Sequence, residues 1–384
     1  MSLVPALRPV RAALALILAA STSVCFGSSP AIPDDKAVAR RRADYVSFTA
    51  ISENDLYTVG TESDRYYTTG QKLTIISDRM SSFGEAFAFL PAKILAEFAS
   101  PPRTPAAAPG LPIEPTPPPP EPTQLRVASS LGQNMFTPAD LHTPVLQADD
   151  RPYAAWLYLS FALQARSTAA GPRAHLSVWG VDVGLVGPDA LGKTIQDFVH
   201  DRISHSPRAQ GWHHQLRNEP GLNLYHQTKL RRTLGDRRTL AAEVIGHAGF
   251  SLGNVATYAN TGAALRLGFG LPDDFGTDII RSGADTTQAG GRPPTAWGLH
   301  LFGGFDARLV GRDIFLNGNT LTRSHRIAHE VFVGDFQFGL TLNYRRCTIA
   351  FSQVRRSPEF KLQGHTQAYG SLTLTIPISA RTSR

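Results

Sequence analysis

The sequence predicts an all-β protein, and within that class a closed antiparallel transmembrane β-barrel of about 12 strands. Many stretches alternate between apolar and polar residues with a period of two, which is the periodicity of a β-strand. These stretches run to roughly 10–14 residues, which exceeds the usual five or six and suits a tilted membrane crossing. Outside the N-terminal region, no apolar run reaches the ~18 residues that a membrane-spanning helix needs.

Residues 1–27 are predicted to be a secretory signal peptide. Arg8 and Arg11 form a basic start, the apolar stretch 12–20 follows, and small residues lead to an expected cleavage position near Gly27. The remaining residues, 28–384, are then expected to form a single exported barrel domain.

The amino-acid composition limits the kinds of molecule that the protein is expected to bind. Of the 384 residues, 42% are hydrophobic, which excludes a wholly disordered chain. The formal net charge is +7, and the basic residues are almost all arginine because the chain has only six lysines. An arginine-rich surface suits a phosphorylated partner, whereas a GC-rich genome would produce the same bias without any function. The exported chain has no aromatic-basic motif, so we expect no nucleic-acid partner.

The alternation is clearest in two stretches, 264–271 and 335–344. In the second, one face carries Phe336, Phe338, Leu340, Leu342 and Tyr344. We expect such apolar faces to meet lipid, and Arg266, Asp335 and Gln337 on the opposite faces to point into the barrel. Four aromatic residues are expected at the membrane interfaces, namely Trp156, Trp179, Trp297 and Tyr344.

Twelve strands are expected in chain order, an even number that allows a single chain to close into a barrel. They are predicted near residues 44–54, 67–77, 124–133, 154–166, 173–186, 221–230, 238–250, 256–269, 295–308, 328–343, 346–356 and 365–378.

Two stretches interrupt the alternation. Residues 79–123 are rich in Pro and Ala, which favours extended structure without a core. They follow two strands, an even number, so they are expected to be an insertion on the periplasmic side, where the chain starts. Residues 187–219 should contain a helix over 190–204, beginning near Pro188 and Asp189. Because this loop follows five expected strands, an odd number, it should lie on the outer side.

Three polar segments, 53–70, 132–157 and 184–219, should meet at one end of the barrel, because all of them follow strands that run in the same direction. In this order they contain END, DRYYTTG, GQNMFTP, DRPYA and a spaced GPDA…Q…H…GW…Q…NE pattern. Together these motifs resemble the LpxR family of lipid A 3'-O-deacylases, over almost the whole mature chain. The resemblance implies a twelve-stranded outer-membrane barrel whose partner is lipid A or lipopolysaccharide. It also implies a Ca²⁺-dependent esterase that removes the 3'-linked acyloxyacyl chain.

The resemblance assigns roles to particular residues. The family's Asn-Asp pair falls on Asn54 and Asp55, its Thr on Thr68, and its helix residues on Gln196 and His200. A neutral histidine is a suitable base near pH 7, so His200 is expected to activate water. Asp55 and Asn54 could supply oxygen ligands to calcium. Either Asn54 or Thr68 could donate a hydrogen bond to the oxyanion.

Arg65 and Arg151 have two open interpretations. They are expected either to bind the phosphates of lipid A or to form ion pairs with Asp64 and Asp150. We expect the protein to be a monomer with its active site facing the outer leaflet.

Two further classes of function remain open. One is a phospholipase or another lipid esterase on the same scaffold, and the other is a barrel without enzymatic activity, such as a porin. A Gly-Phe-Ser-Leu-Gly sequence at 249–253 matches the nucleophile-elbow pattern. That motif requires a strand-to-helix turn, and here it lies between two expected strands, so Ser251 is not expected to be a nucleophile.

Overall fold

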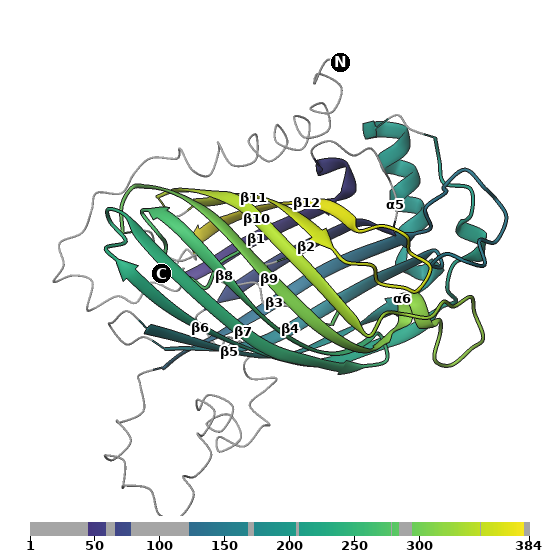
Figure 1. Cartoon of the computed structure of the whole chain (residues 1–384), viewed down its shortest axis with the longest axis horizontal. Coiled ribbons are helices and arrows are strands. Elements are labelled where there is room, and N and C mark those ends of the chain that lie inside the picture. Colours follow the sequence, from purple (N-terminus) through teal and green to yellow (C-terminus); the bar gives the residue numbers. More distant parts are fainter. Residues whose placement is uncertain are drawn as a thin grey trace, which may run out of the picture.

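In the computed structural model, twelve strands close into one antiparallel barrel, which confirms the predicted fold class (Figure 1). The structure describes residues 45–58, 66–77, 123–167, 173–204, 207–277, 279–283, 294–345 and 347–379. The predicted signal peptide, Arg65 and nearly all of the Pro/Ala-rich stretch 79–123 lie outside these residues. Among the described segments, no helix is long and apolar enough to cross a membrane.

Each strand pairs with its neighbours in sequence, and β1 also pairs with β12, so that the sheet has no open edge. The strands are β1 (Tyr45–Asn54), β2 (Tyr66–Ser77), β3 (Thr123–Thr137), β4 (Ala154–Ser167), β5 (Arg173–Val186), β6 (Glu219–Gly235), β7 (Ala241–Gly253), β8 (Ala256–Phe269), β9 (Trp297–Asp313), β10 (Phe332–Tyr344), β11 (Cys347–Arg356) and β12 (Gln367–Ser379).

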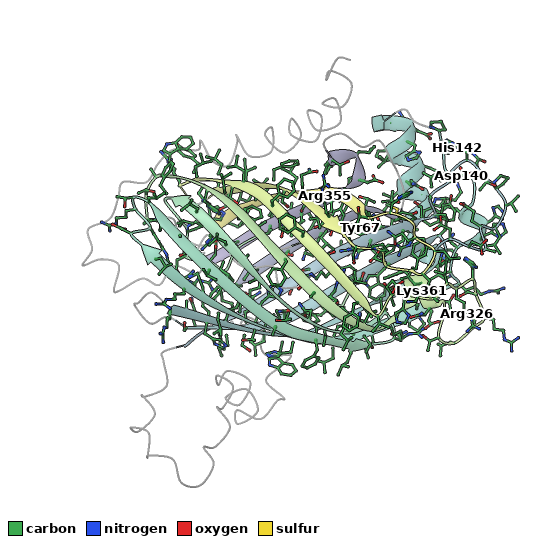
Figure 2. All side chains as sticks on the ribbon, viewed as in Figure 1. Tyr67, Asp140, His142, Arg326, Arg355 and Lys361 are labelled. Atoms are coloured by element: carbon green, nitrogen blue, oxygen red, sulfur yellow. The ribbon has the colours of Figure 1, made fainter. Side chains whose placement is uncertain are left out.

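The connections at one end of the barrel carry the helical segments, and we call this the loop end (Figure 1). They are η1 (Asp55–Tyr57), η2 (Pro188–Ala190), α5 (Gly192–Val199), the π-helical turn η3 (His200–Ser204), η4 (Trp212–His214) and α6 (Ile314–Asn317). Figure 2 shows Asp140, His142, Arg326 and Lys361 at this same end. The opposite end, where β6 joins β7 and β8 joins β9, is called the base.

The expected strand ranges agree closely with the observed ones. β5 and β8 match their predicted ranges, 173–186 and 256–269, at both ends. β6 and β9 are longer than predicted, because their hydrogen-bonded ladders continue beyond the apolar stretch into polar residues such as those of 231–235.

The barrel is apolar outside and polar inside. On β10, the outward side chains Phe336, Phe338 and Leu340 are 42–53% exposed, whereas inward Asp335 and Thr341 are at most 4% exposed. This pattern is the reverse of a water-soluble protein and leaves a surface that only lipid would cover favourably.

Trp156 is not at a membrane interface, although the sequence predicts it there. It is fully buried and stacks on Tyr158. Trp297, by contrast, is 54% exposed, and its ring lies 4.3 Å from that of Tyr344. The prediction for Trp156 is wrong because alternation turns Trp156 and Tyr158 to the same inward face of β4, where an apolar cluster fills the loop end of the barrel.

The connection between β8 and β9 turns back into the barrel. Its described residues 271–277 and 279–283 form what we call the lumen segment. Phe275, Ile279 and Ile280 of this segment are at most 6% exposed, and Ile279 belongs to the apolar cluster at the loop end. Gly276 has a φ of 88°, a conformation that favours glycine. The lumen segment therefore fills the barrel from the base towards the loop end.

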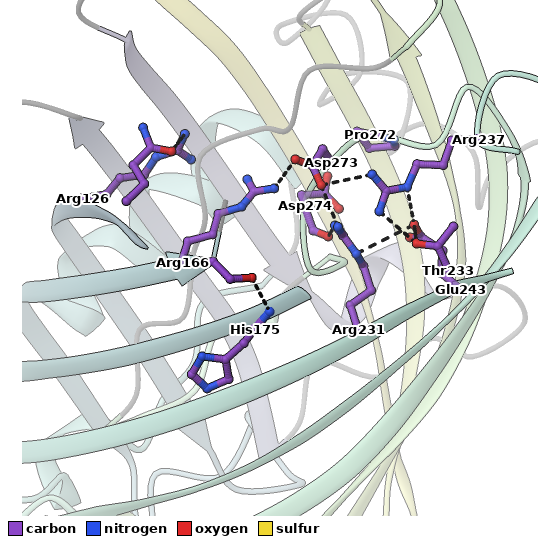
Figure 3. Close-up of polar contacts among 12 residues, drawn as sticks. Arg126, Arg166, His175, Arg231, Thr233, Arg237, Glu243, Pro272, Asp273 and Asp274 are labelled. Carbon is purple, nitrogen blue, oxygen red and sulfur yellow. Dashed lines mark hydrogen bonds and ion pairs between the residues drawn. The ribbon is translucent and has the colours of Figure 1, made fainter. Parts of the chain in front are cut away.

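A cluster of arginines and acids anchors the lumen segment at the base (Figure 3). Arg231 lies 2.6 Å from Asp273, and Arg237 lies 3.1 Å from the same carboxylate. Glu243 pairs with Arg266, which also pairs with Asp274. Burial alone would raise the pKa of Asp273, but Arg166 and Arg231 outweigh it and lower that pKa to about 2. The charges at the base therefore neutralise one another within the protein.

Candidate active site between the barrel wall and a loop helix

Part of the outer wall at the loop end is covered by protein instead of being exposed. Leu131 and Leu159, lower on the wall, are 48% and 49% exposed. Met135 and Ala155, which alternation turns to the same outward face, are at most 1% exposed. They pack in a cluster with Trp212 of the loop between β5 and β6. The loop predicted over 187–219 thus lies against the outside of the barrel.

Backbone and side-chain hydrogen bonds fix this loop to the wall. The Gln133 side chain donates to the carbonyl of Ala190 at 2.6 Å, and the Gly187 N–H donates to the carbonyl of Ala155 at 3.1 Å. At the start of α5, a Cβ on Gly192 would lie 2.5 Å from the Cβ of Ala155, so that the close approach requires glycine.

Gln196 is buried on the face of α5 that meets the wall. Its Oε1 accepts a hydrogen bond of 2.6 Å from Trp212 Nε1. Its Nε2 is also buried and has no hydrogen-bond partner among the described residues. A buried, unsatisfied donor is costly and marks a position where a ligand or water would be bound favourably.

His200 lies where α5 changes into the π-helical turn η3, a local geometry often found at functional sites. It is 5% exposed, and its Nδ1 lies 2.6 Å from the carbonyl oxygen of Pro207. Because a carbonyl can only accept, Nδ1 carries the proton and the lone pair of the neutral ring is on Nε2. The exposed ion pair between Asp201 and Arg208 joins this turn to the chain that follows Pro207. The hydrogen bond from Arg208 lowers the pKa of Asp201.

Asn54 and Asp55 end β1 and start the short helix η1. The Asn54 Oδ1 accepts a hydrogen bond of 2.7 Å from the N–H of Leu56, as in an ordinary helix cap. The Asp55 side chain is 1% exposed, and its backbone carbonyl accepts from the Thr58 hydroxyl at 2.7 Å. The cap leaves the Asn54 Nδ2 group available as a donor.

Thr68 occupies a β-bulge. Tyr67 pairs with Phe136 and Thr69 pairs with Met135, so Thr68 is the extra residue on β2. Its hydroxyl lies 2.7 Å from that of Thr137, which alternation turns away from the inward ring of Phe136. The bulge thereby directs Thr68 to the outward face of the wall.

The predicted residues are linked through neighbouring strands. Asn54 pairs with Thr69, and Thr69 pairs with Met135. Met135 packs in the cluster that contains Trp212, the hydrogen-bond partner of Gln196. Asn54, Thr68 and Gln196 are therefore linked through three adjoining strands and Trp212, and His200 follows Gln196 by one helical turn.

Arg151 has a different environment from the one expected of a phosphate ligand. It is fully buried, its guanidinium lies 4.5 Å above the ring of Phe136, and it forms an ion pair of 3.0 Å with Glu359. The pairing partner is Glu359 and not the carboxylate of Asp150. Burial would raise the pKa of Glu359, but Arg356 and Arg151 outweigh it and lower that pKa. This geometry gives Arg151 a role in joining two loops.

Sequence reasoning assigned no role to Trp212, Thr137, Tyr67 or Glu53. Trp212 was visible as the tryptophan of the GW motif, but its contact with Gln196 depends on how the loop folds back. The expectation for Ser251 agrees with its environment, because it lies within β7, fully buried, and donates to the carbonyl of Ala256 at 3.0 Å.

The donor set around Asn54 and Asp55 fits a cation that prefers oxygen ligands. The oxygen groups there are a carboxylate, an amide oxygen that also caps η1, and backbone carbonyls, a set that suits calcium better than zinc. Within the described ranges, no three His, Cys, Asp or Glu side chains form a group that could hold a metal. A cation here would depend on one carboxylate, Asp55, and on neutral oxygens.

The fold and this site define an outer-membrane type of β-barrel that carries its candidate site on the outside of the wall, under a loop helix. The family model described as outer membrane protein LpxR matches residues 14–378, and the chain belongs to this family. A search of curated proteins gave no match.

Three solved structures are similar to this chain, and the first supports its fold. LpxR from Salmonella typhimurium matches with a TM-score of 0.63 and 18% sequence identity, covering 86% of this chain and 99% of that chain. The beta domain of the Bordetella autotransporter BrkA matches with a TM-score of 0.40 and 9% identity, covering 88% of this chain and 99% of that one. The translocator domain of NalP from Neisseria meningitidis has a TM-score of 0.39 at 10% identity, covering 98% of this chain and 100% of that chain.

Proposed function

We propose that the protein is a lipid A 3'-O-deacylase, an esterase that hydrolyses the bond to the 3'-linked acyloxyacyl chain. One observation carries this proposal. The family match extends over residues 14–378, and Asn54, Thr68 and Gln196, at positions that the family resemblance assigns, are linked through adjoining strands and Trp212.

The position of the site suits a substrate that is embedded in the membrane. The site lies on the outward face of the wall, and the same face continues into exposed apolar side chains such as Leu131 and Leu159. Acyl chains could lie against these side chains while the ester reaches the polar residues above them. A substrate in the outer leaflet would meet the site at this level if the loop end faces outwards, as strand parity predicts.

The proposed mechanism uses His200 as the general base. Its Nε2 takes a proton from a water molecule, which attacks the ester carbonyl, and His200 then returns the proton to the leaving sugar oxygen. Asn54 Nδ2 or the Thr68 hydroxyl donates to the oxyanion. Calcium, when bound through Asp55 and Asn54, would add positive charge that polarises the carbonyl. The hydrogen bond to Pro207 holds the imidazole in the tautomer that this role requires.

The closed sheet also supports a monomer in the outer membrane. β1 pairs with β12, so a single chain leaves no unpaired strand edge for a second copy to complete.

Mass spectrometry of lipid A tests the proposal. The refolded protein is incubated with lipid A in detergent, once with calcium and once with a chelator. Loss of one acyloxyacyl unit only in the presence of calcium is the expected result, and fragmentation should place the loss at the 3' position. A folded protein that leaves lipid A intact but hydrolyses phospholipids would replace the proposal with a phospholipase.

A further inference from the structure

Glu53, which immediately precedes the Asn54–Asp55 pair, points to the other side of the wall. Its side chain is fully buried, and both of its carboxylate oxygens accept hydrogen bonds. Oε2 accepts from the Tyr67 hydroxyl at 2.8 Å, and Oε1 accepts from the backbone N–H of Ile280 at 2.8 Å. Ile280 belongs to the lumen segment, so a side chain next to the candidate site is held from inside the barrel.

The partners of Glu53 differ from those of three other acids in the barrel interior. Glu243, Asp306 and Asp335 each form ion pairs with arginine. In the part of the chain that the structure describes, the hydrogen bonds to Glu53 come from two neutral donors. A neutral side chain of the same shape could therefore accept or donate at the same points, while Lys72 and Arg356 act on Glu53 only through their charge.

The Glu53–Tyr67 hydrogen bond joins the two strands that carry the candidate site. Glu53 precedes Asn54 on β1, and Tyr67 precedes the bulge residue Thr68 on β2. A Cβ on Gly70 would lie 1.9 Å from the Tyr67 hydroxyl, so the absence of a side chain there leaves room for Tyr67 to reach Glu53.

Tyr67 is itself fixed on its other sides. Its ring lies 5.5 Å from that of Phe136 and 4.9 Å from that of Tyr369. Its backbone carbonyl accepts a hydrogen bond of 3.1 Å from Gln367. Glu53 is therefore held against a rigid neighbour.

We propose that Glu53 is a positioning residue, which sets the spacing between the Asn54–Asp55 turn and Thr68 through its hydrogen bonds to Tyr67 and Ile280. The inference rests on the proposed esterase function, because these are the residues that would contact the ester. Glu53 faces the lumen and does not touch the substrate, so its loss should lower kcat and leave KM nearly unchanged.

The test compares four variants of the full-length, refolded protein with wild type, using lipid A as substrate. Glu53→Ala should lower kcat about tenfold to a hundredfold, as expected when catalytic groups are displaced by an ångström or less. Glu53→Gln should restore most of the rate, because its amide can accept from Ile280 and donate to Tyr67. Tyr67→Phe should give part of the loss, and Glu53→Ala/Tyr67→Phe should lose little more than Glu53→Ala alone.

Asp273→Ala is the matched control. Asp273 is an acid of the lumen segment that belongs to the ion-pair cluster at the base. It should lower the melting temperature without changing kcat per folded molecule, and gel mobility of unheated samples reports the folded fraction. Equal kcat in wild type and Glu53→Ala, or failure of Glu53→Gln to restore the rate, would overturn the positioning role while the deacylase proposal stands. A folded wild-type protein without deacylase activity would overturn both.

Discussion

The two ends of the barrel use polar residues in opposite ways. At the base, Arg231 and Arg237 pair with Asp273 and Glu243 (Figure 3). Arg266 pairs with Glu243 and Asp274, so that charge is neutralised within the protein. At the candidate site, Asn54, Thr68 and Gln196 are held by neutral hydrogen bonds instead, and Gln196 Nε2 is left without a partner among the described residues.

This difference separates residues that hold the barrel together from residues that are available for chemistry. A saturated ion-pair cluster resists change, because removing one member leaves a buried charge without compensation. His200, by contrast, is held through Nδ1 by the neutral carbonyl of Pro207. Substitutions at the base should therefore affect stability, and substitutions under the loop helix should affect activity.

The largest effect is expected for His200→Ala. Loss of a general base lowers rates by about 10²–10⁴-fold, so deacylation of lipid A should fall by that factor while the barrel stays folded. Initial rates of acyl release, measured with calcium present, give the comparison. His142→Ala, an exposed histidine at the same end, serves as the control and should keep full activity. Full activity of His200→Ala would remove this residue from the mechanism.

The next effect concerns calcium. With Asp55 as the one carboxylate in the proposed donor set, Asp55→Asn should raise the calcium concentration for half-maximal activity about tenfold or more. Titration calorimetry should show a parallel loss of calcium binding, which does not depend on catalysis. Asp140→Asn changes an exposed acid of a neighbouring loop and should leave both quantities as in wild type. An unchanged calcium dependence in Asp55→Asn would place the metal elsewhere.

At the base, Glu243→Ala should reduce the free energy of unfolding by about 3–5 kcal/mol, because it removes a fully buried carboxylate that pairs with both Arg266 and Arg237. Activity per folded molecule should not change. Urea unfolding in detergent measures the difference. Glu330→Ala breaks an exposed pair with Lys361 at the loop end and should cost less than about 1 kcal/mol. A large loss of kcat in Glu243→Ala would contradict the division between the two ends.

The sequence predicts most of the barrel because period-two alternation is a local property of each strand. The inward path of the lumen segment could not be predicted in this way, since residues 271–283 have no periodicity and their contacts are distant. The hydrogen bond between Glu53 and Ile280, for example, spans 227 residues. The motif residues could be recognised because each motif is local in the sequence. The burial of Trp156 and the bulge at Thr68 could not be predicted, because both depend on contacts with other strands.

The smallest effect is a dependence of stability on acidity that originates at the base. The folded-state pKa of Asp273 is about 2, below the ~3.9 of an unperturbed aspartate, so its ionised form stabilises the folded protein above pH ~4. That contribution should disappear as the pH falls from about 4 to 2. Asp273 is half exposed, and solvent screening keeps the effect small. Melting temperatures of wild type and Asp273→Asn should therefore converge between pH 4 and pH 2, and a constant difference over this range would show that the pairing with Arg166 and Arg231 contributes nothing through charge.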